Sequence, residues 1–582
     1  MKRMKNTLVF LLIAAMMLTL SSCSGRNEQE AFGEYTWVLF EDTATASTIN
    51  LNYLLKDPKA YGITDSEVTL GEMDFSEEAL AEDKKELEKT WKELKAFDYQ
   101  KLTEEQQLIY DVLDSYMETQ LKSYDFIDLY EPFAFTSGEH ANMPIVLASY
   151  RFDDADDVED YLKILELLPD YFDDLLEFEK EKSEKGLFMS ETSAENVIQQ
   201  CRDYIADPEH NVLIESFQDR VEEVGGLTEQ QIQEYVSANH DAVLEYVIPA
   251  YENTIAVFEE LKSTGQNSLG LAYYENGKEY YQYLLESKVG TDRTAEEVIR
   301  MIEEATDQVM QEMYETAIAD QEGYSSYVEN YENLYKELDP IKAIRDLEQS
   351  MSNRFPQIPS VEFTVTPVHE SMQSITSPAY YILAPIDDYQ NNSIFTNETG
   401  SITGALWSTL AHEGIPGHMY QHVYYVSQDP EPVRSALNFD GYTEGWAVYV
   451  EMMSFAYYDF EEELYGKMEM YNDQLNLLIS ARAEIGINYE GWTLGDVEDY
   501  LASVGVNAEA AQSIMDYVIA EPANYQMYCV GWLEWEAMRD YAEEELGDRF
   551  DEVKFHQALL DVGPCQFGIL QAQLDEYIKS VQ

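Results

Sequence analysis

Basic residues are scarce in this chain, and their scarcity limits what the protein can bind. The 582 residues include 36 lysines and arginines against 113 aspartates and glutamates, so the formal net charge is −77 at pH 7. Such a surface repels a phosphate backbone, which excludes a nucleic-acid-binding protein. The charge would also steer cationic peptides toward a cleft, but a hydrated acidic coat on an exposed protein explains it more simply.

Cysteine is rarer still, with four residues in all. Cys201, Cys529 and Cys565 lie far apart in the sequence. Their number and spacing imply no disulfide framework. The fold must therefore be stabilised by its core, and the composition allows a large one, since hydrophobic residues make up 45% of the chain and aromatic residues 13%.

Long apolar runs are confined to the N-terminus. Basic residues there precede an apolar stretch over residues 8–20, which is too short to span a bilayer and is typical of a targeting segment. The stretch ends in Leu-Ser-Ser-Cys23, which resembles a bacterial lipobox, in which the cysteine is lipidated and becomes the mature N-terminus. We predict a lipoprotein signal peptide over residues 1–23 and a polar tether over residues 24–35. An ordinary cleaved signal peptide is the alternative.

Helical patterns dominate the next 325 residues, from 36 to 360. Apolar residues recur at helical spacing after Thr103, which opens a capping-box sequence, and the same start signal appears at Thr228 and Thr294. Near residue 360 the pattern changes, and residues 361–365, 379–383 and 394–397 read as strands. The sequence therefore predicts a mainly α fold with a small β-sheet, whose edge would suit an extended peptide.

A histidine-rich segment follows these strands and organises the chemistry of the chain. Three of the 8 histidines lie within residues 411–422, namely His412, His418 and His422, and Glu413 directly follows the first. Zinc prefers imidazole and carboxylate ligands, and hydrolytic zinc sites often place a glutamate beside a histidine ligand as general base. The segment therefore predicts a zinc site.

The spacing of these histidines leaves two ligand pairs open. His412 and His418 are six residues apart, about 120° around a regular helix, so they share a metal only if Pro416 and Gly417 break the helix. His418 and His422 are four residues apart and would share a helix face without a break. We prefer His412 and His418. Only that pair explains why a glutamate directly follows a histidine ligand, at Glu413, and why the Pro-Gly break separates the two histidines.

Residues 412–421 resemble the motif H-E-(A/G)-x-P-G-H-x-x-Q of a bacterial family labelled domain of unknown function 885, which is grouped with the zincin-like metallopeptidases. Residues 441–451 resemble its E-G-W-A helix, which implies that Glu444 is the third zinc ligand. The resemblance thus implies one Zn²⁺ per chain in a His2Glu site with an open position for water. Glu451 shares a helical face with Glu444, so it either orients a ligand or is a solvated surface charge.

Three further residues are candidates for stabilising the oxyanion. A family segment that usually contains a histidine resembles residues 484–492, where this chain has Asn488. A C-terminal block with the pattern P-G-Q-A-x-x-Y-x-x-G resembles residues 522–531 and includes Tyr528. Tyr442, beside Glu444, is the competing phenol, and a buried core tyrosine is the plainer interpretation of either one. We expect the isolated His369 and His556 to be structural.

The resemblance covers nearly all of the mature chain and implies a large two-lobed helical zincin-like (neurolysin-like) fold. We predict a helical N-terminal lobe over residues 36–360 and a zinc-binding catalytic lobe over residues 361–582, joined in one family domain. The expected function is an extracytoplasmic, membrane-anchored zinc peptidase in which Glu413 takes the proton of the attacking water. The alternatives are a non-catalytic metal- or peptide-binding lipoprotein and a zinc hydrolase of non-peptide amides or esters.

Overall fold

The described part of the chain is mainly helical with one small sheet, as predicted. The computed structural model describes residues 27–582 apart from 65, 72, 136, 337, 375 and 398–405. The predicted signal peptide and Cys23 lie outside the described residues. In the part of the chain that is described, no helix combines the length and the apolar composition that a bilayer crossing requires.

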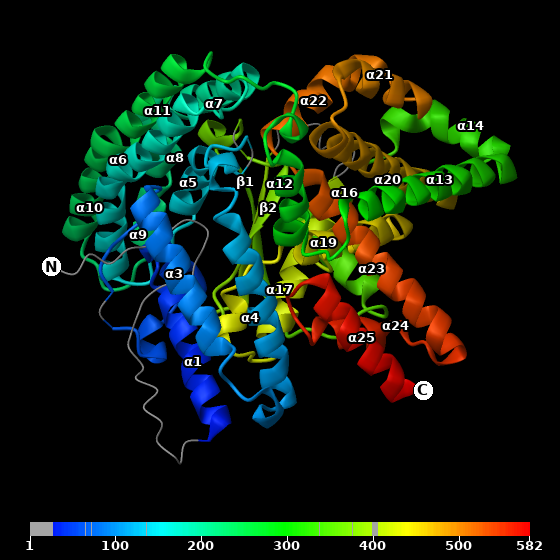
Figure 1. Ribbon diagram of the computed structural model, residues 1–582, viewed down its shortest axis with the longest axis horizontal. Helices are drawn as coiled ribbons and strands as arrows, with labels where there is room; N and C mark the ends of the chain where they lie inside the picture. Colours follow the sequence, from blue (N-terminus) through cyan, green and yellow to red (C-terminus); the bar gives the residue numbers. More distant parts are fainter. Residues whose placement is uncertain are drawn as a thin grey trace.

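The first part of the chain forms two groups of helices. Figure 1 shows α1, α3 and α4 at the lower left and α6, α7, α10 and α11 above them. The predicted capping boxes at Thr103, Thr228 and Thr294 are confirmed, since each hydroxyl accepts from the third helical N–H. The helices are α1 (Glu28–Ala44), α2 (Thr48–Leu54), α3 (Glu77–Leu94), α4 (Glu104–Ser123), α5 (Glu139–Ala148), α6 (Ala155–Glu184), α7 (Glu191–Tyr204), α8 (Val212–Glu215), α9 (Phe217–Glu222), α10 (Glu229–Ala242) and α11 (Ile248–Leu261).

The predicted polar tether over residues 24–35 is wrong from Glu28 onward. Helix α1 begins there, after Asn27 caps its first turn. Phe32 is 1% exposed and packs in the main core, where its ring lies 5.3 Å from that of Phe97. Burial of these aromatic side chains holds the segment on the protein, although its composition reads as polar.

The remaining helices surround the histidine-rich segment. In Figure 1, α13, α14, α20 and α21 lie at the upper right and α24 and α25 at the lower right. They are α12 (Gly277–Leu284), α13 (Ala295–Ala319), α14 (Gln321–Asn330), α15 (Pro340–Met351), α16 (Leu406–Glu413), α17 (His418–Val426), α18 (Pro432–Ser435), α19 (Asp440–Ser454), α20 (Glu463–Ile485), α21 (Leu494–Ser503), α22 (Ala511–Ala520), α23 (Asn524–Leu546), α24 (Glu552–Leu560) and α25 (Phe567–Val581). Three π-helical turns, η5 (Val243–Val247), η7 (Leu285–Val289) and η11 (Gly486–Glu490), follow α10, α12 and α20.

The sheet lies directly before α16, as the strand patterns predict. It contains β1 (Glu362–Pro367), β2 (Ala379–Ile382) and β3 (Asn391–Thr396) in the order β1-β3-β2. Strand β1 runs parallel to β3 and β2 runs antiparallel to it. Both β1 and β2 are therefore edge strands, and β2 packs against α16.

The hydrophobic cores do not divide at residue 360. The main core extends from Phe32 to Ile578 and joins the first helices to the last ones. A second core lies among α5, α6, α7 and α11, and it also takes in Val368 and Met372 beside the sheet. A third, small core joins η11 to α21 and α22. Packing thus binds residues from both predicted lobes into one main core.

Helices α19 and α23 cross in backbone contact at the centre of the molecule (Figure 1). A Cβ atom added at Gly445 would lie 2.3 Å from the carbonyl carbon of Gly531. Trp446 directly follows Gly445, and Trp535 lies four residues after Gly531. Their rings meet edge to face, with 5.0 Å between the ring centres. Glycine at this crossing lets the two helices approach closely, which fixes the side chains they carry relative to one another.

Candidate metal centre

The predicted break between the two histidines is confirmed. Helix α16 ends at Glu413 and α17 begins at His418, with no helical residue between them. A Cβ atom at Gly417 would lie 1.8 Å from the carbonyl oxygen of His412, so the chain can double back only with glycine there. The rings of His412 and His418 consequently meet at 4.7 Å, almost perpendicular to each other.

Glu444 completes a three-residue cluster with the two histidines. It projects from α19, and its Oε2 lies 3.3 Å from Nε2 of His412 and 3.3 Å from Nε2 of His418. One ligand atom from each of the three residues lies within 4.8 Å of the others. Two donors bound to one tetrahedral zinc at about 2.0–2.1 Å are separated by roughly 3.3 Å. The donor types and their spacing therefore fit a zinc ion.

A second carboxylate orients the first histidine. Oε2 of Glu451 lies 3.0 Å from Nδ1 of His412, which holds the ring with its Nε2 atom directed at Glu444. The indole of Trp446 also donates to the carbonyl oxygen of Pro416 at 2.9 Å, so α19 holds the break itself. Of the two interpretations of Glu451, the structure supports the orienting one.

The electrostatics of the cluster favour a cation. Burial acts to lower the pKa of His412, but the carboxylates of Glu444 and Glu451 outweigh it and raise that pKa well above its usual value. Burial likewise acts to raise the pKa of Glu444, but His418 and His412 lower it below the usual range for a carboxyl group. The cluster is thus a place where ionised carboxylate and positive charge stabilise each other.

Glu413 lies beside the cluster but is directed to the sheet. It is 9% exposed, and its Oε2 accepts a hydrogen bond from the backbone N–H of Tyr381 in β2 at 2.9 Å. Burial raises its pKa, against the lowering effect of His412 and His418. A buried carboxylate with a raised pKa, held next to a candidate metal site, has the properties that a general base requires.

The structure places the three oxyanion candidates in different surroundings. The Tyr528 ring lies 6.2 Å from the ring of His412, and the Glu444 carboxylate together with burial keeps the phenol pKa well above its usual value, so it stays a donor. Tyr442 is 1% exposed and packs in the core beside Trp535, which excludes it as a partner for substrate.

The structure also excludes Asn488 as a catalytic residue. It is fully buried in η11, where its Oδ1 accepts from the N–H of Leu271 at 3.0 Å and its Nδ2 donates to the carbonyl oxygen of Val518 at 2.9 Å. Both polar atoms of the side chain therefore hold three chain segments together. Its expected role at the oxyanion is wrong, because the fully buried side chain is bound to these two backbone partners and is closed off from substrate.

The other histidines and the cysteines lie outside the cluster. His422 bonds to the carbonyl oxygen of Ala384 at 2.7 Å, and burial lowers its pKa to about 4. His369 bonds to Ser371 and Glu215, and His556 to Tyr449 and the carbonyl oxygen of Arg354, which confirms the structural role expected of both. The remaining described cysteines are free and buried; they are Cys201, Cys529 and Cys565.

A family model described as "Bacterial protein of unknown function (DUF885)" matches residues 60–574. The chain belongs to this family. A comparison with curated proteins gives no match. The resemblance to the family is thus not limited to the histidine motif and the E-G-W-A helix, because the match covers most of the chain.

Two solved structures share the fold of this DUF885 protein. A "putative lipoprotein" from Colwellia psychrerythraea aligns with a TM-score of 0.79 at 18% identity, over 95% of this chain and 100% of that one. A "putative lipoprotein of unknown function" from Shewanella oneidensis aligns with a TM-score of 0.62 at 17% identity, over 94% and 98% of the two chains. At these identities the likeness establishes the fold alone.

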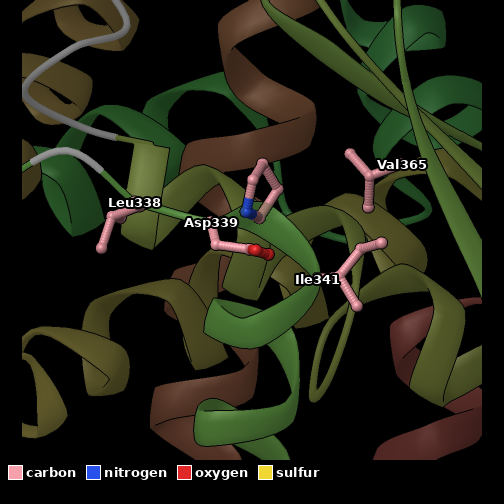
Figure 2. A pocket seen from close by; sticks show the side chains of 5 residues that line it. Leu338, Asp339, Ile341 and Val365 are labelled. Atoms are coloured by element: carbon pink, nitrogen blue, oxygen red, sulfur yellow. The ribbon is translucent and has the colours of Figure 1, made fainter.

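A surface hollow lies near the other edge of the sheet in this DUF885 protein (Figure 2). Its volume is about 570 Å³, and its walls come from the start of α15 and from β1. Leu338, Pro340, Ile341 and Val365 line it with apolar groups, and Asp339 adds one carboxylate. It contains none of the three candidate ligands, and it adjoins β1 rather than β2.

Sequence reasoning missed one contributor to the site, the backbone of Tyr381. Alternation predicted a strand at residues 379–383, but the pattern alone does not say which edge of that strand faces Glu413. Tyr381 pairs with Ile394 of β3, and the hydrogen bond from its N–H to Glu413 settles the question. The N–H of Tyr381 points away from β3 and toward the metal cluster.

Proposed function

We propose that this DUF885 protein is a zinc-dependent peptidase with a zincin-like, neurolysin-like two-lobed fold. The observation that carries the proposal is the convergence of His412, His418 and Glu444 on one point, with Glu413 next to it. The break at Gly417 exists to make that convergence possible, since a continuous helix would separate the histidines.

Each residue of the cluster has a definable task in such a reaction. His412, His418 and Glu444 would hold the metal, and Glu451 would fix the ring of His412. A zinc ion bound there would polarise the scissile carbonyl and lower the pKa of water. Glu413 would accept the proton of the attacking water and deliver it to the leaving amine, and Tyr528 would donate a hydrogen bond to the oxyanion.

The outer edge of β2, which pairs with no other described strand, supports a peptide as the substrate. In an antiparallel pair, alternate residues direct their backbone groups away from the partner strand, so Ala379 and Tyr381 face outward. The N–H of Tyr381 reaches Glu413, which shows that this edge borders the metal cluster. An extended peptide adding to β2 would therefore lie alongside the cluster and gain main-chain hydrogen bonds.

The two alternative functions would use the same site but leave some of its features without a role. A non-peptide amide or ester would need the metal and Glu413 but not the strand edge. A non-catalytic binding lipoprotein would need neither the buried Glu413 nor its raised pKa, and burying a carboxylate without a function is costly. The peptidase is the function that uses all of these features.

We propose that the enzyme acts outside the cytoplasm, anchored to the membrane. The support is the lipobox-like sequence at Cys23 and the description of the two similar structures as lipoproteins. Its partners are then a peptide and a membrane surface reached through the lipid.

Cleavage of a mixed peptide library, with and without a chelator, tests the proposal. Wild-type protein loaded with zinc should hydrolyse library peptides, and the chelator should stop it. Glu413→Gln should keep its zinc and lose about 10²–10⁴-fold in rate, because an amide cannot accept the proton. Glu463→Gln, on a glutamate side chain that is 85% exposed, is the matched control and should behave as wild type. Full activity of Glu413→Gln would refute the assigned base.

A further inference from the structure

Lys288 lies between the two helices that carry Glu444 and Tyr528. It belongs to the π-helical turn η7, which contacts both α19 and α23. The carbonyl oxygen of Val289 lies so close to α19 that a Cβ atom at Gly441 would be 2.1 Å from it. The backbone on which Lys288 stands is therefore fixed against the first turn of α19, one turn before Glu444.

Lys288 is half-buried, and its ammonium group makes one hydrogen bond within the part of the chain that the structure describes. Its Nζ donates to the carbonyl oxygen of Pro522 at 3.4 Å, which is long for such a bond. Within the described ranges it forms no salt bridge at 4.0 Å or less. The acidic neighbour Glu286 is already paired with Lys122. An ammonium has three donors, so two remain for another group.

Two buried carboxyl groups interact with the charge of Lys288, but neither forms a salt bridge with it, and the pKa of each stays raised. The Lys288 charge lowers the pKa of Glu484, yet burial prevails and raises that pKa to about 8, so this group is protonated at neutral pH. Burial and Glu444 likewise raise the pKa of Asp440, against the effects of Asn438 and Lys288. In a chain with a net charge of −77, Lys288 stands out as a lysine with no salt bridge among the described residues, on backbone packed against the first turn of the helix that carries Glu444, and it can bind an anionic group.

We propose that Lys288 binds the free C-terminal carboxylate of the peptide substrate, so that the enzyme releases residues from peptide C-termini. This inference rests on the proposed peptidase function and defines its substrate class. A carboxylate complements the ammonium, and the surrounding acidic surface would otherwise repel a negatively charged chain end. Asp440 and Glu444 are one turn apart on α19, about 6 Å along the axis, which an extended chain spans with roughly two residues. The expected products are therefore single residues or dipeptides.

A matched pair of peptides tests the assignment. An N-acetylated six-residue peptide of alanine and phenylalanine is prepared once with a free C-terminus and once as the C-terminal amide. Wild-type enzyme should prefer the free acid in kcat/KM. Lys288→Ala should lower kcat/KM for the free acid by about 10–100-fold and leave the amide unchanged, the scale of one lost hydrogen bond to a charged group. Lys288→Arg should restore part of the preference, since it restores the charge.

Lys278→Ala is the matched control. Lys278 lies on α12, one element before Lys288, and its ammonium sits 5.4 Å from the ring centre of Tyr489, outside the proposed site. This variant should cleave both peptides as wild type does. Thermal unfolding of each variant separates a lost contact from a misfolded protein.

Binding of the same two peptides to zinc-loaded Glu413→Gln, measured by calorimetry, gives a second readout that needs no turnover. The free acid should bind more tightly than the amide, and adding Lys288→Ala should abolish the difference. Equal binding of acid and amide, or equal loss of both in Lys288→Ala, would overturn the inference while leaving the peptidase in place. Preferential binding of the acid without hydrolysis by wild type would instead overturn the peptidase and retain Lys288 as a carboxylate site.

Discussion

A single methyl group placed between α19 and α23 should disturb both stability and the metal centre. In Gly445→Ala the new Cβ would lie 2.3 Å from the Gly531 carbonyl carbon, whereas ordinary contacts begin at 3.4 Å. The atom it meets belongs to the backbone of α23 and cannot rotate away. The two helices must therefore separate by about 1 Å, the difference between these two distances.

The expected cost follows from two opposing effects. Overpacking a core costs about 1–3 kcal/mol, and a clash with backbone belongs at the upper end of that range. Alanine also favours the helix over glycine by about 1 kcal/mol. The free energy of unfolding should thus fall by about 2 kcal/mol. Because Glu444 precedes the substituted residue, hydrolysis and zinc affinity should fall as well.

Gly33→Ala is the control, because the same substitution there should raise the free energy of unfolding instead of lowering it. Gly33 lies inside α1, and a Cβ atom there would meet nothing within 4 Å. The same chemical change should therefore stabilise the protein by about 0.5–1 kcal/mol. Urea unfolding followed by circular dichroism and by the fluorescence of Trp446 and Trp535, which meet at the crossing, measures both variants. If Gly445→Ala were as stable as Gly33→Ala, the close crossing would be refuted.

Three further changes probe the site and the anchor. Glu451→Ala should weaken zinc binding by about 10–100-fold in a chelator competition, because His412 loses the partner that orients it; unchanged affinity would contradict that role. Tyr528→Phe should lower kcat by about 10²–10³-fold with zinc content and thermal stability intact, and a normal kcat would exclude Tyr528 from the reaction. Cys23→Ala should move the protein from the membrane fraction to the soluble fraction. Mass spectrometry of wild type should find a lipid on that cysteine, and a mature N-terminus elsewhere would dispose of the anchor.

Local interactions explain which features the sequence predicts. A capping box involves residues three apart, so the helix starts after Thr103, Thr228 and Thr294 are predictable. The break at Gly417 is equally local, because Pro416 and Gly417 do not continue a helix and the spacing of the two histidines requires one to end. The choice of His412 and His418 therefore rests on Glu413 and on this break, since spacing alone also allows His418 and His422, and the family resemblance supplies Glu444.

Side-chain environment explains which features the sequence does not predict. Tyr442, Asn488 and Tyr528 are equally good candidates by residue type. Packing puts Tyr442 in the core, uses both polar atoms of Asn488 on Leu271 and Val518, and leaves Tyr528 beside His412. None of these partners is close in the sequence, so no local pattern encodes the outcome.

The sequence by itself determined the helix starts, the small sheet and the ligand set of the candidate metal centre, because each depends on residues a few positions apart or on a family motif. The tertiary structure decided that Phe32 anchors a segment that reads as a tether, that the β2 edge faces Glu413, and that Lys288 stands between α19 and α23. Those outcomes depend on contacts between segments up to hundreds of residues apart. They are fixed by the packing of the whole chain, which short-range patterns do not record.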